Sequence, residues 1–72
     1  MDYCVVVQAR GKELDQLRQV AYRVSRDTQT DWYAEPRKSG TAFCFENADA
    51  RTRFCAICAN ENVAYATEHP TQ

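Results

Sequence analysis

Apolar residues alternate with polar ones, or form short β-branched runs, in four stretches of this chain. A period of two is typical of strands that bury one or both of their faces. The predicted strands cover residues 2–9, 31–35, 41–46 and 63–67. Residues 36–40 join the second strand to the third, and Pro36 and Gly40 indicate a hairpin loop there.

Two longer stretches show the 3.6-residue spacing of an amphipathic helix. The first runs from about residue 11 to residue 25. Its apolar residues are Leu14, Leu17, Val20, Ala21 and Val24. The second helix spans residues 48–60, and Asn47 is well suited to be its N-cap. Phe54 and Ile57 are expected to form the buried stripe of this second helix.

The order of these elements is strand, helix, strand, strand, helix, strand, which predicts an α+β protein. Two β-α-β halves joined by a hairpin describe a ferredoxin-like split β-α-β sandwich (βαββαβ). In that fold a four-stranded antiparallel sheet carries two helices on one face, and the first and third strands lie at its centre. We expect one such domain over residues 1–68 and a polar C-terminal tail over residues 69–72.

Alternation along the strands assigns the side chains of the sheet to two faces. The larger apolar residues are expected to lie under the helices: Tyr3, Val5, Val7, Phe43, Phe45, Val63 and Tyr65. The smaller ones fall on the opposite face: Cys4, Val6, Ala42, Cys44, Ala64 and Ala66. No segment of the chain remains to cover this second face, so the sequence predicts an open apolar patch that binds a partner. Trp32 and Tyr33 are adjacent and should face opposite sides, with the exposed one anchoring the interface.

Cys55 and Cys58 form a C-x-x-C pair, the strongest chemical motif in the chain. A redox pair of this kind places its first cysteine at a helix N-terminus, where backbone N–H groups lower its pKa. Cys55 is expected about two turns inside its helix, with Cys58 at the edge of the buried stripe. Both are therefore predicted to be packing residues.

Zinc would require four thiols to converge, and the predicted fold separates them. Cys4 and Cys44 belong to the open sheet face, whereas the C-x-x-C pair lies on a helix behind the other face. No metal or other cofactor is predicted. A disulfide between Cys4 and Cys44 is geometrically conceivable, but the expected reducing compartment favours free thiols.

Charge and composition narrow the function further. Nine Lys and Arg residues oppose ten Asp and Glu residues without forming blocks, which argues against a basic surface for nucleic acid. No apolar run approaches the ~20 residues of a membrane span, and the first residues lack a signal peptide, so a cytoplasmic protein is expected. The only histidine, His69, lies in the tail, and no nucleophile is paired with a base. The sequence therefore predicts a protein that is not an enzyme.

Residues 38–47 suggest an alternative, because this stretch resembles the third-strand motif of RNA-recognition-motif domains. The matching positions are Lys38, Gly40, Ala42 and Phe43. The resemblance implies binding of single-stranded nucleic acid, with Tyr3 stacking on a base. Thr41 replaces one of the stacking aromatics of that motif, and the alternative needs Tyr3, Phe43 and Phe45 to be exposed.

The preferred interpretation is a small non-catalytic module that binds another protein. Chains of this size without a catalytic set are often accessory or inhibitory proteins. They include products of phages and mobile elements that block a host defence complex such as CRISPR–Cas. A homodimer through the open sheet face is a further expectation, whereas nucleic acid and membranes are not expected partners.

Overall fold

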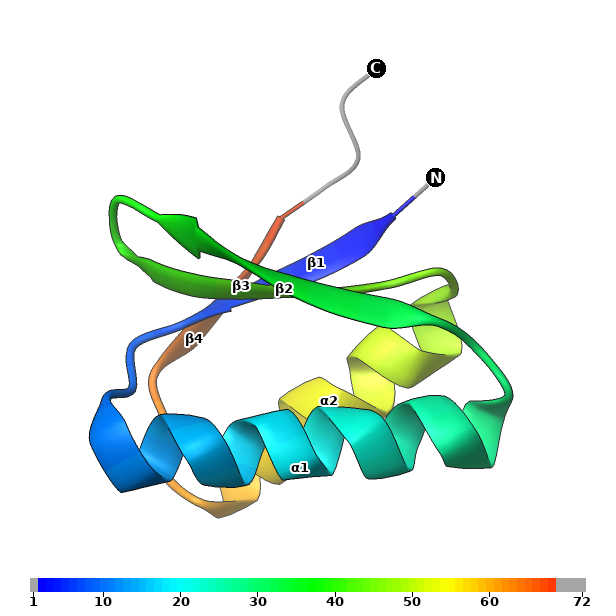
Figure 1. The fold of residues 1–72 in the computed structure, drawn as a ribbon, viewed down its shortest axis with the longest axis horizontal. Helices are drawn as coiled ribbons and strands as arrows, with labels where there is room; N and C mark the ends of the chain where they lie inside the picture. The colour runs from blue at the N-terminus through cyan, green and yellow to red at the C-terminus, as the bar shows by residue number, and fades with distance from the viewer. Residues whose placement is uncertain (1, 69–72) are drawn as a thin grey trace.

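Two helices pack against one face of a four-stranded antiparallel sheet in the computed structural model, which describes residues 2–68 (Figure 1). The elements are β1 (Tyr3–Val7), α1 (Gly11–Thr28), β2 (Trp32–Arg37), β3 (Gly40–Phe45), α2 (Ala48–Asn60) and β4 (Tyr65–Glu68). The strand order is β2-β3-β1-β4, which places β1 and β3 at the centre, as predicted. The α+β class, the antiparallel sheet and the two helices are thus confirmed. The predicted tail with His69 lies outside the described residues.

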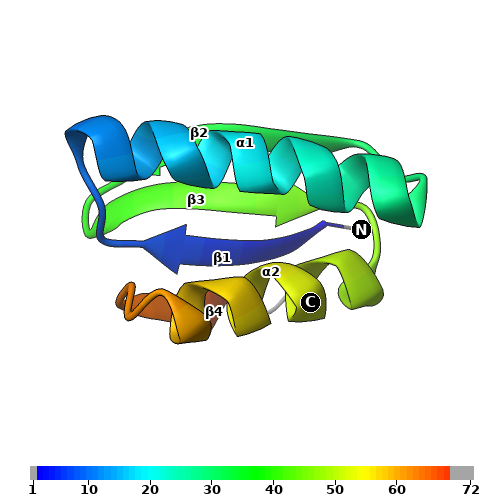
Figure 2. The same ribbon diagram turned by 90° about the horizontal axis from the view of Figure 1, so that it is seen from below.

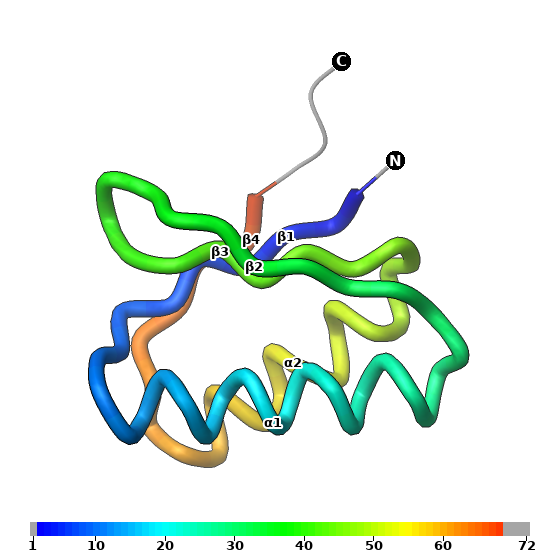
Figure 3. Tube along the Cα trace, in the orientation of Figure 1, coloured from blue at the N-terminus to red at the C-terminus, as the bar shows by residue number. Residues whose placement is uncertain are grey.

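Seen from the helical side, α1 and α2 flank the two central strands (Figure 2). The trace in Figure 3 shows both helices on the same side of the sheet, and no part of residues 2–68 forms a layer on its other side. The face of the sheet that the helices leave uncovered is called the open face below.

Several element boundaries differ from those expected; β1, for example, covers Tyr3–Val7 and not the whole of residues 2–9. Helix α1 continues to Thr28, whose hydroxyl donates to the carbonyl oxygen of Val24 at 2.7 Å, and Gln29 ends it in a left-handed conformation. The hairpin loop narrows to residues 38–39, because Pro36 lies in an edge strand, where its missing N–H costs no sheet hydrogen bond. Strand β4 begins two residues later than expected, at Tyr65.

The core lies between the sheet and the helices, and aromatic contacts join its layers. Phe54 of α2 contacts Phe43 and Phe45 of β3, with ring centroids 5.0 and 5.4 Å apart. The buried stripe of α2 consists of Ala50, Phe54 and Cys58, four residues apart. The expected stripe of Phe54 and Ile57 was therefore wrong in part, since Cys58 is fully buried and Ile57 only half-buried.

The predicted division of the sheet into two faces is confirmed for the central strands. Val5, Val7, Phe43 and Phe45 belong to the core under the helices. Tyr65 is the exception: it pairs with Val7 but is 41% exposed, because it lies on an edge strand.

The side chain of Asn47 confirms the predicted N-cap of α2. Its Oδ1 accepts a hydrogen bond from the backbone N–H of Ala50 at 2.8 Å. One N–H of the first turn is thereby satisfied, which stabilises the helix start by about 1 kcal/mol.

Gly40 allows the hairpin to approach β1 closely. It has φ of +150°, and a Cβ at this position would lie 2.2 Å from the carbonyl oxygen of Val7. We expect Gly40→Ala to lower the free energy of unfolding by at least about 2 kcal/mol, since backbone must move. Gly11→Ala is the matched control, with positive φ but open space around it, and should cost about 1 kcal/mol. Chemical denaturation measures both; equal losses would contradict this account of Gly40.

Candidate protein-binding face

The backbone register places the predicted small residues together on the open face. Cys4 pairs with Cys44 across β1 and β3, and Val6 lies between Ala42 and Ala66. Ala64 is on the same side as Ala66, two residues away: its carbonyl oxygen accepts from the N–H of Gln8, which is two residues beyond Val6. The prediction that these small residues share one face of the sheet is therefore confirmed.

Burial at the centre of the open face differs from the prediction. Ala42 and Cys44 are fully buried, and Cys4 and Val6 are each only 7% exposed. These four residues form a small core cluster of their own. The expected open apolar patch is thus wrong for the central strands, and only Ala64 and Ala66 of the predicted small residues are exposed.

Arg37 crosses the open face, where no helix or strand of residues 2–68 covers the small side chains of β1 and β3. Its guanidinium donates to both carboxylate oxygens of Glu68, at 3.1 and 3.2 Å, and also contacts the carboxylate of Glu35. Arg37 and Glu68 belong to β2 and β4, the two edges of the sheet, so their contact crosses above β3 and β1. We call this bridge of Glu35, Arg37 and Glu68 the strap.

The strap was not predicted from the sequence, although the alternation of side chains along β2 indicated which of them share a face. Tyr33, Glu35 and Arg37 lie at every second position of β2 and all face the open side. The pairing partner across the sheet, Glu68, is 31 residues away from Arg37 along the chain. The acidic partners also raise the pKa of Arg37, so its positive charge is permanent.

Trp32 and Tyr33 lie on opposite sides of β2, as predicted. Trp32 stacks on Phe43 on the helical side, with ring centroids 5.9 Å apart, so it is not part of the open face. Tyr33 is 44% exposed on the open face, and its hydroxyl donates to Oδ2 of Asp2 at 2.7 Å. This hydrogen bond to a carboxylate raises the pKa of Tyr33.

Cys4 and Cys44 form a disulfide, which corrects the expectation of free thiols at these positions. They are direct partners in the register of β1 and β3, with Cα atoms 4.0 Å apart. The bond links residues 40 positions apart in the chain and lies in the row between Tyr33 and Glu68. A covalent bond therefore joins the two central strands under the strap.

The C-x-x-C thiols lie far from this bond, on α2. Cys58 is fully buried in the main core, and burial raises its pKa to about 11. Burial also raises the pKa of Cys55, although Arg51 opposes this shift. Both thiols are free and protonated at neutral pH, which makes them poor nucleophiles and poor metal ligands. Within residues 2–68, no three side chains form a potential metal site.

The aromatic residues that a base-stacking surface would need are not on the open face. Phe43 and Phe45 are at most 1% exposed and lie under the helices. Tyr3 is half-buried, and the guanidinium of Arg51 lies 5.2 Å from its ring centroid. The reversed assignment of faces, on which the nucleic-acid alternative depended, is therefore wrong.

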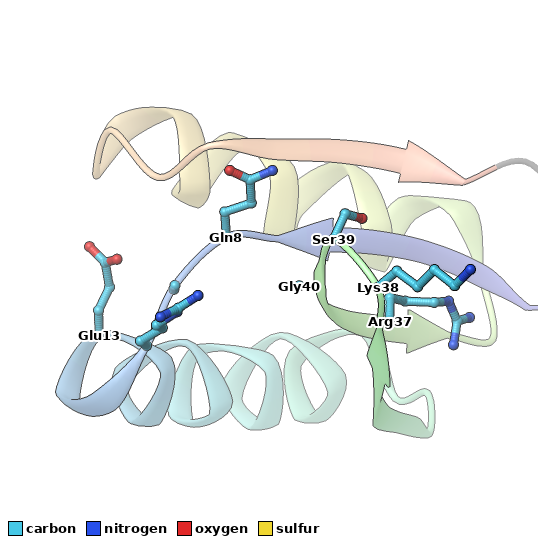
Figure 4. Close-up of a pocket in the computed structure, with 8 residues that line it drawn as sticks. Gln8, Glu13, Arg37, Lys38, Ser39 and Gly40 are labelled. Atoms are coloured by element: carbon cyan, nitrogen blue, oxygen red, sulfur yellow. The ribbon is translucent and has the colours of Figure 1, made fainter.

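A hollow of about 650 Å³ opens where the β2–β3 hairpin meets the start of α1 (Figure 4). Its charged lining residues are Arg10, Glu13, Arg37 and Lys38. Figure 4 shows the side chains of Arg37 and Lys38 extending together, away from Glu13. Arg37 is already engaged in the strap, so these groups do not converge on a common ligand position.

No protein-family model matches this sequence, and no curated protein is significantly similar to it. None of the helices in residues 2–68 has the length and apolar character needed to cross a membrane.

The disulfide can be tested by counting thiols in the denatured, unreduced protein. Two thiols per chain are expected, from Cys55 and Cys58, out of four cysteines. Reduction should lower the free energy of unfolding by about 3–4 kcal/mol, because the bond closes a 40-residue loop. The Cys4→Ala/Cys44→Ala variant is the control and should not respond to reductant. A count of four thiols would exclude the bond.

Removal of the strap should expose the disulfide without unfolding the sheet. In Arg37→Gln, we expect reduction by excess dithiothreitol to be several-fold faster, measured by alkylation and mass spectrometry. The stability loss should stay below about 1 kcal/mol, because the ion pairs are partly exposed to water. Arg53→Gln removes the exposed pair with Asp49 on α2 and should leave the rate unchanged. Identical rates in Arg37→Gln and the wild type would contradict a covering role.

Proposed function

We propose that this chain is a small ferredoxin-like, non-catalytic protein that binds another protein through the open face. The observation that carries the proposal is a complete sheet face over which residues 2–68 place no second layer. Two-layer packing normally leaves a sheet face either polar or covered. Here its centre is apolar, and the Arg37–Glu68 ion pair of the strap crosses it from one edge strand to the other.

The chemistry of the rim supports a protein partner. Tyr33 is exposed at the β2 edge, and tyrosine is enriched at protein interfaces because it offers both a ring and a hydroxyl group. Ala64 and Ala66 are exposed at the β4 edge, where small side chains let a partner approach the sheet closely. The guanidinium of Arg37 reaches from the β2 edge to Glu68 of β4 and can donate to carboxylates of a partner as it does to Glu68.

A ferredoxin-like topology is supported by the strand order and by the two β-α-β halves. We further propose an accessory or inhibitory role, of the kind that phage and mobile-element proteins perform against host complexes such as CRISPR–Cas. This step rests on size and architecture alone. A second copy of the chain is the alternative occupant of the open face.

We also propose a cytoplasmic location, because no apolar run of the sequence approaches the ~20 residues of a membrane span. The Cys4–Cys44 disulfide points to an oxidising compartment instead, because cytosolic thiols are kept reduced. Alkylation of thiols in intact cells of the native host decides between them. Four reactive thiols per denatured chain support the cytoplasm, whereas two protected cysteines exclude it.

Substitution at the exposed rim tests the binding face directly. Ala66→Arg should reduce recovery of the partner from the native host at least tenfold, because a long cation replaces a methyl group at the contact. The measurement is quantitative mass spectrometry of proteins that co-purify with the tagged chain. Light scattering of the purified chain reports self-association at the same time.

Ala56→Arg is the matched control, since Ala56 is exposed on α2, away from the sheet. It should retain the partner fully, and circular dichroism should show both variants folded. If Ala66→Arg and the wild type recover the same proteins and have the same mass in solution, the open face is not the interface.

A further inference from the structure

A groove between α1 and α2 offers a second surface of different chemistry. Two adjoining hollows, of about 210 and 330 Å³, share Val20 of α1, Ile57 of α2 and Glu61, which directly follows α2. The buried apolar residues Leu17, Val24 and Val63 line their depths, and Val20 and Ile57 are half-buried. The groove therefore has an apolar floor that water still reaches.

Acidic residues dominate the rim of this groove. Glu13, Asp27 and Glu61 are three carboxylates against a single cation, Arg23. None of the three carboxylates is in a salt bridge with another described residue. The net charge of the rim is thus −2, more negative than the −1 of the whole chain. Such a rim favours a cationic partner.

The spacing of the lining residues along α1 defines the direction in which an elongated partner would lie in the groove. Glu13, Val20 and Asp27 are seven residues apart, and all three line the groove. Seven residues are about two helical turns, or about 10.5 Å, so the two carboxylates flank an apolar centre about 21 Å apart. Glu61 adds a carboxylate from the C-terminal end of the facing helix, and it lines both hollows together with Val20.

We infer that this groove binds an amphipathic helical segment of a partner protein, with basic residues on either side of an apolar one. A helix lying along α1 would place an apolar side chain against Val20 and Ile57. Lysine or arginine residues seven positions before and after it would then reach Glu13 and Asp27. This inference is independent of the proposed function, because the groove and the open face lie on opposite sides of the sheet.

Two synthetic helical peptides test the inference on the intact chain. The first carries a central leucine with lysines seven positions away on both sides; the second has glutamate in place of each lysine. We expect the lysine peptide to bind at least tenfold more tightly in titrations followed by nuclear magnetic resonance. The amide resonances of Val20, Ile57 and Glu61 should change their chemical shifts. Higher salt should weaken binding, because exposed charges are screened.

Substitutions in the groove test the contribution of its charged rim and that of its apolar floor separately. Asp27→Asn should weaken the lysine peptide roughly two- to five-fold, as expected for one exposed ion pair. Asp15→Asn is the matched control: it makes the same change on α1 but lies outside the groove and should have no effect. Ile57→Lys should abolish binding, and its amide spectrum shows whether the fold is kept.

Several results would overturn the inference: equal affinity of the two peptides, no binding of either, or equal loss in Asp27→Asn and Asp15→Asn. Chemical shift changes confined to residues of the open face would also overturn it, because the peptide would then bind there and not in the groove. Loss of partner binding in Ala66→Arg leaves the groove untouched, so the two surfaces are tested separately.

Discussion

The two central strands are buried on both faces, and the rest of the structure is arranged around that requirement. Every residue from Cys4 to Val7 in β1 is buried, as is every residue from Ala42 to Phe45 in β3. On one side two helices supply the cover, with Phe54 between the phenylalanines of β3. On the other side only side chains of the edge strands can reach across. Small residues suit this side, since the three side chains of the strap cannot cover a tall apolar surface.

Alternation in the sequence was sufficient to assign the faces of β1 and β3, because the period of a strand is strictly two. Burial could not be predicted in the same way. The strap depends on Arg37 and Glu68, which are brought together only once the order of four strands is known. The Cys4–Cys44 bond similarly requires the register of β1 against β3, whereas the expected reducing compartment favoured free thiols.

The second helix shows a different limit of sequence reasoning. Both Ile57 and Cys58 are compatible with a stripe through Phe54, at three and four residues along the helix. The buried stripe passes through the smaller residue, Cys58, and leaves the larger Ile57 half-exposed at the groove. Which of two neighbours faces the core depends on the angle at which the helix crosses the sheet, and local periodicity contains no information about that angle. The partly exposed isoleucine contributes to the apolar floor of the groove, together with Val20 of α1.

The disulfide between the central strands also changes the covalent connectivity of the chain. Residues between Cys4 and Cys44 form a closed ring that contains α1 and the whole of β2, while α2 and β4 follow outside it. A protease that cuts the exposed turn at residues 38–39 would open the ring without releasing a fragment. Mechanical tension applied through the two ends would likewise bypass the ring and extend only the segments outside it. The chain therefore combines a part that is resistant to severing with a part, α2 and β4, that only non-covalent contacts hold to the sheet.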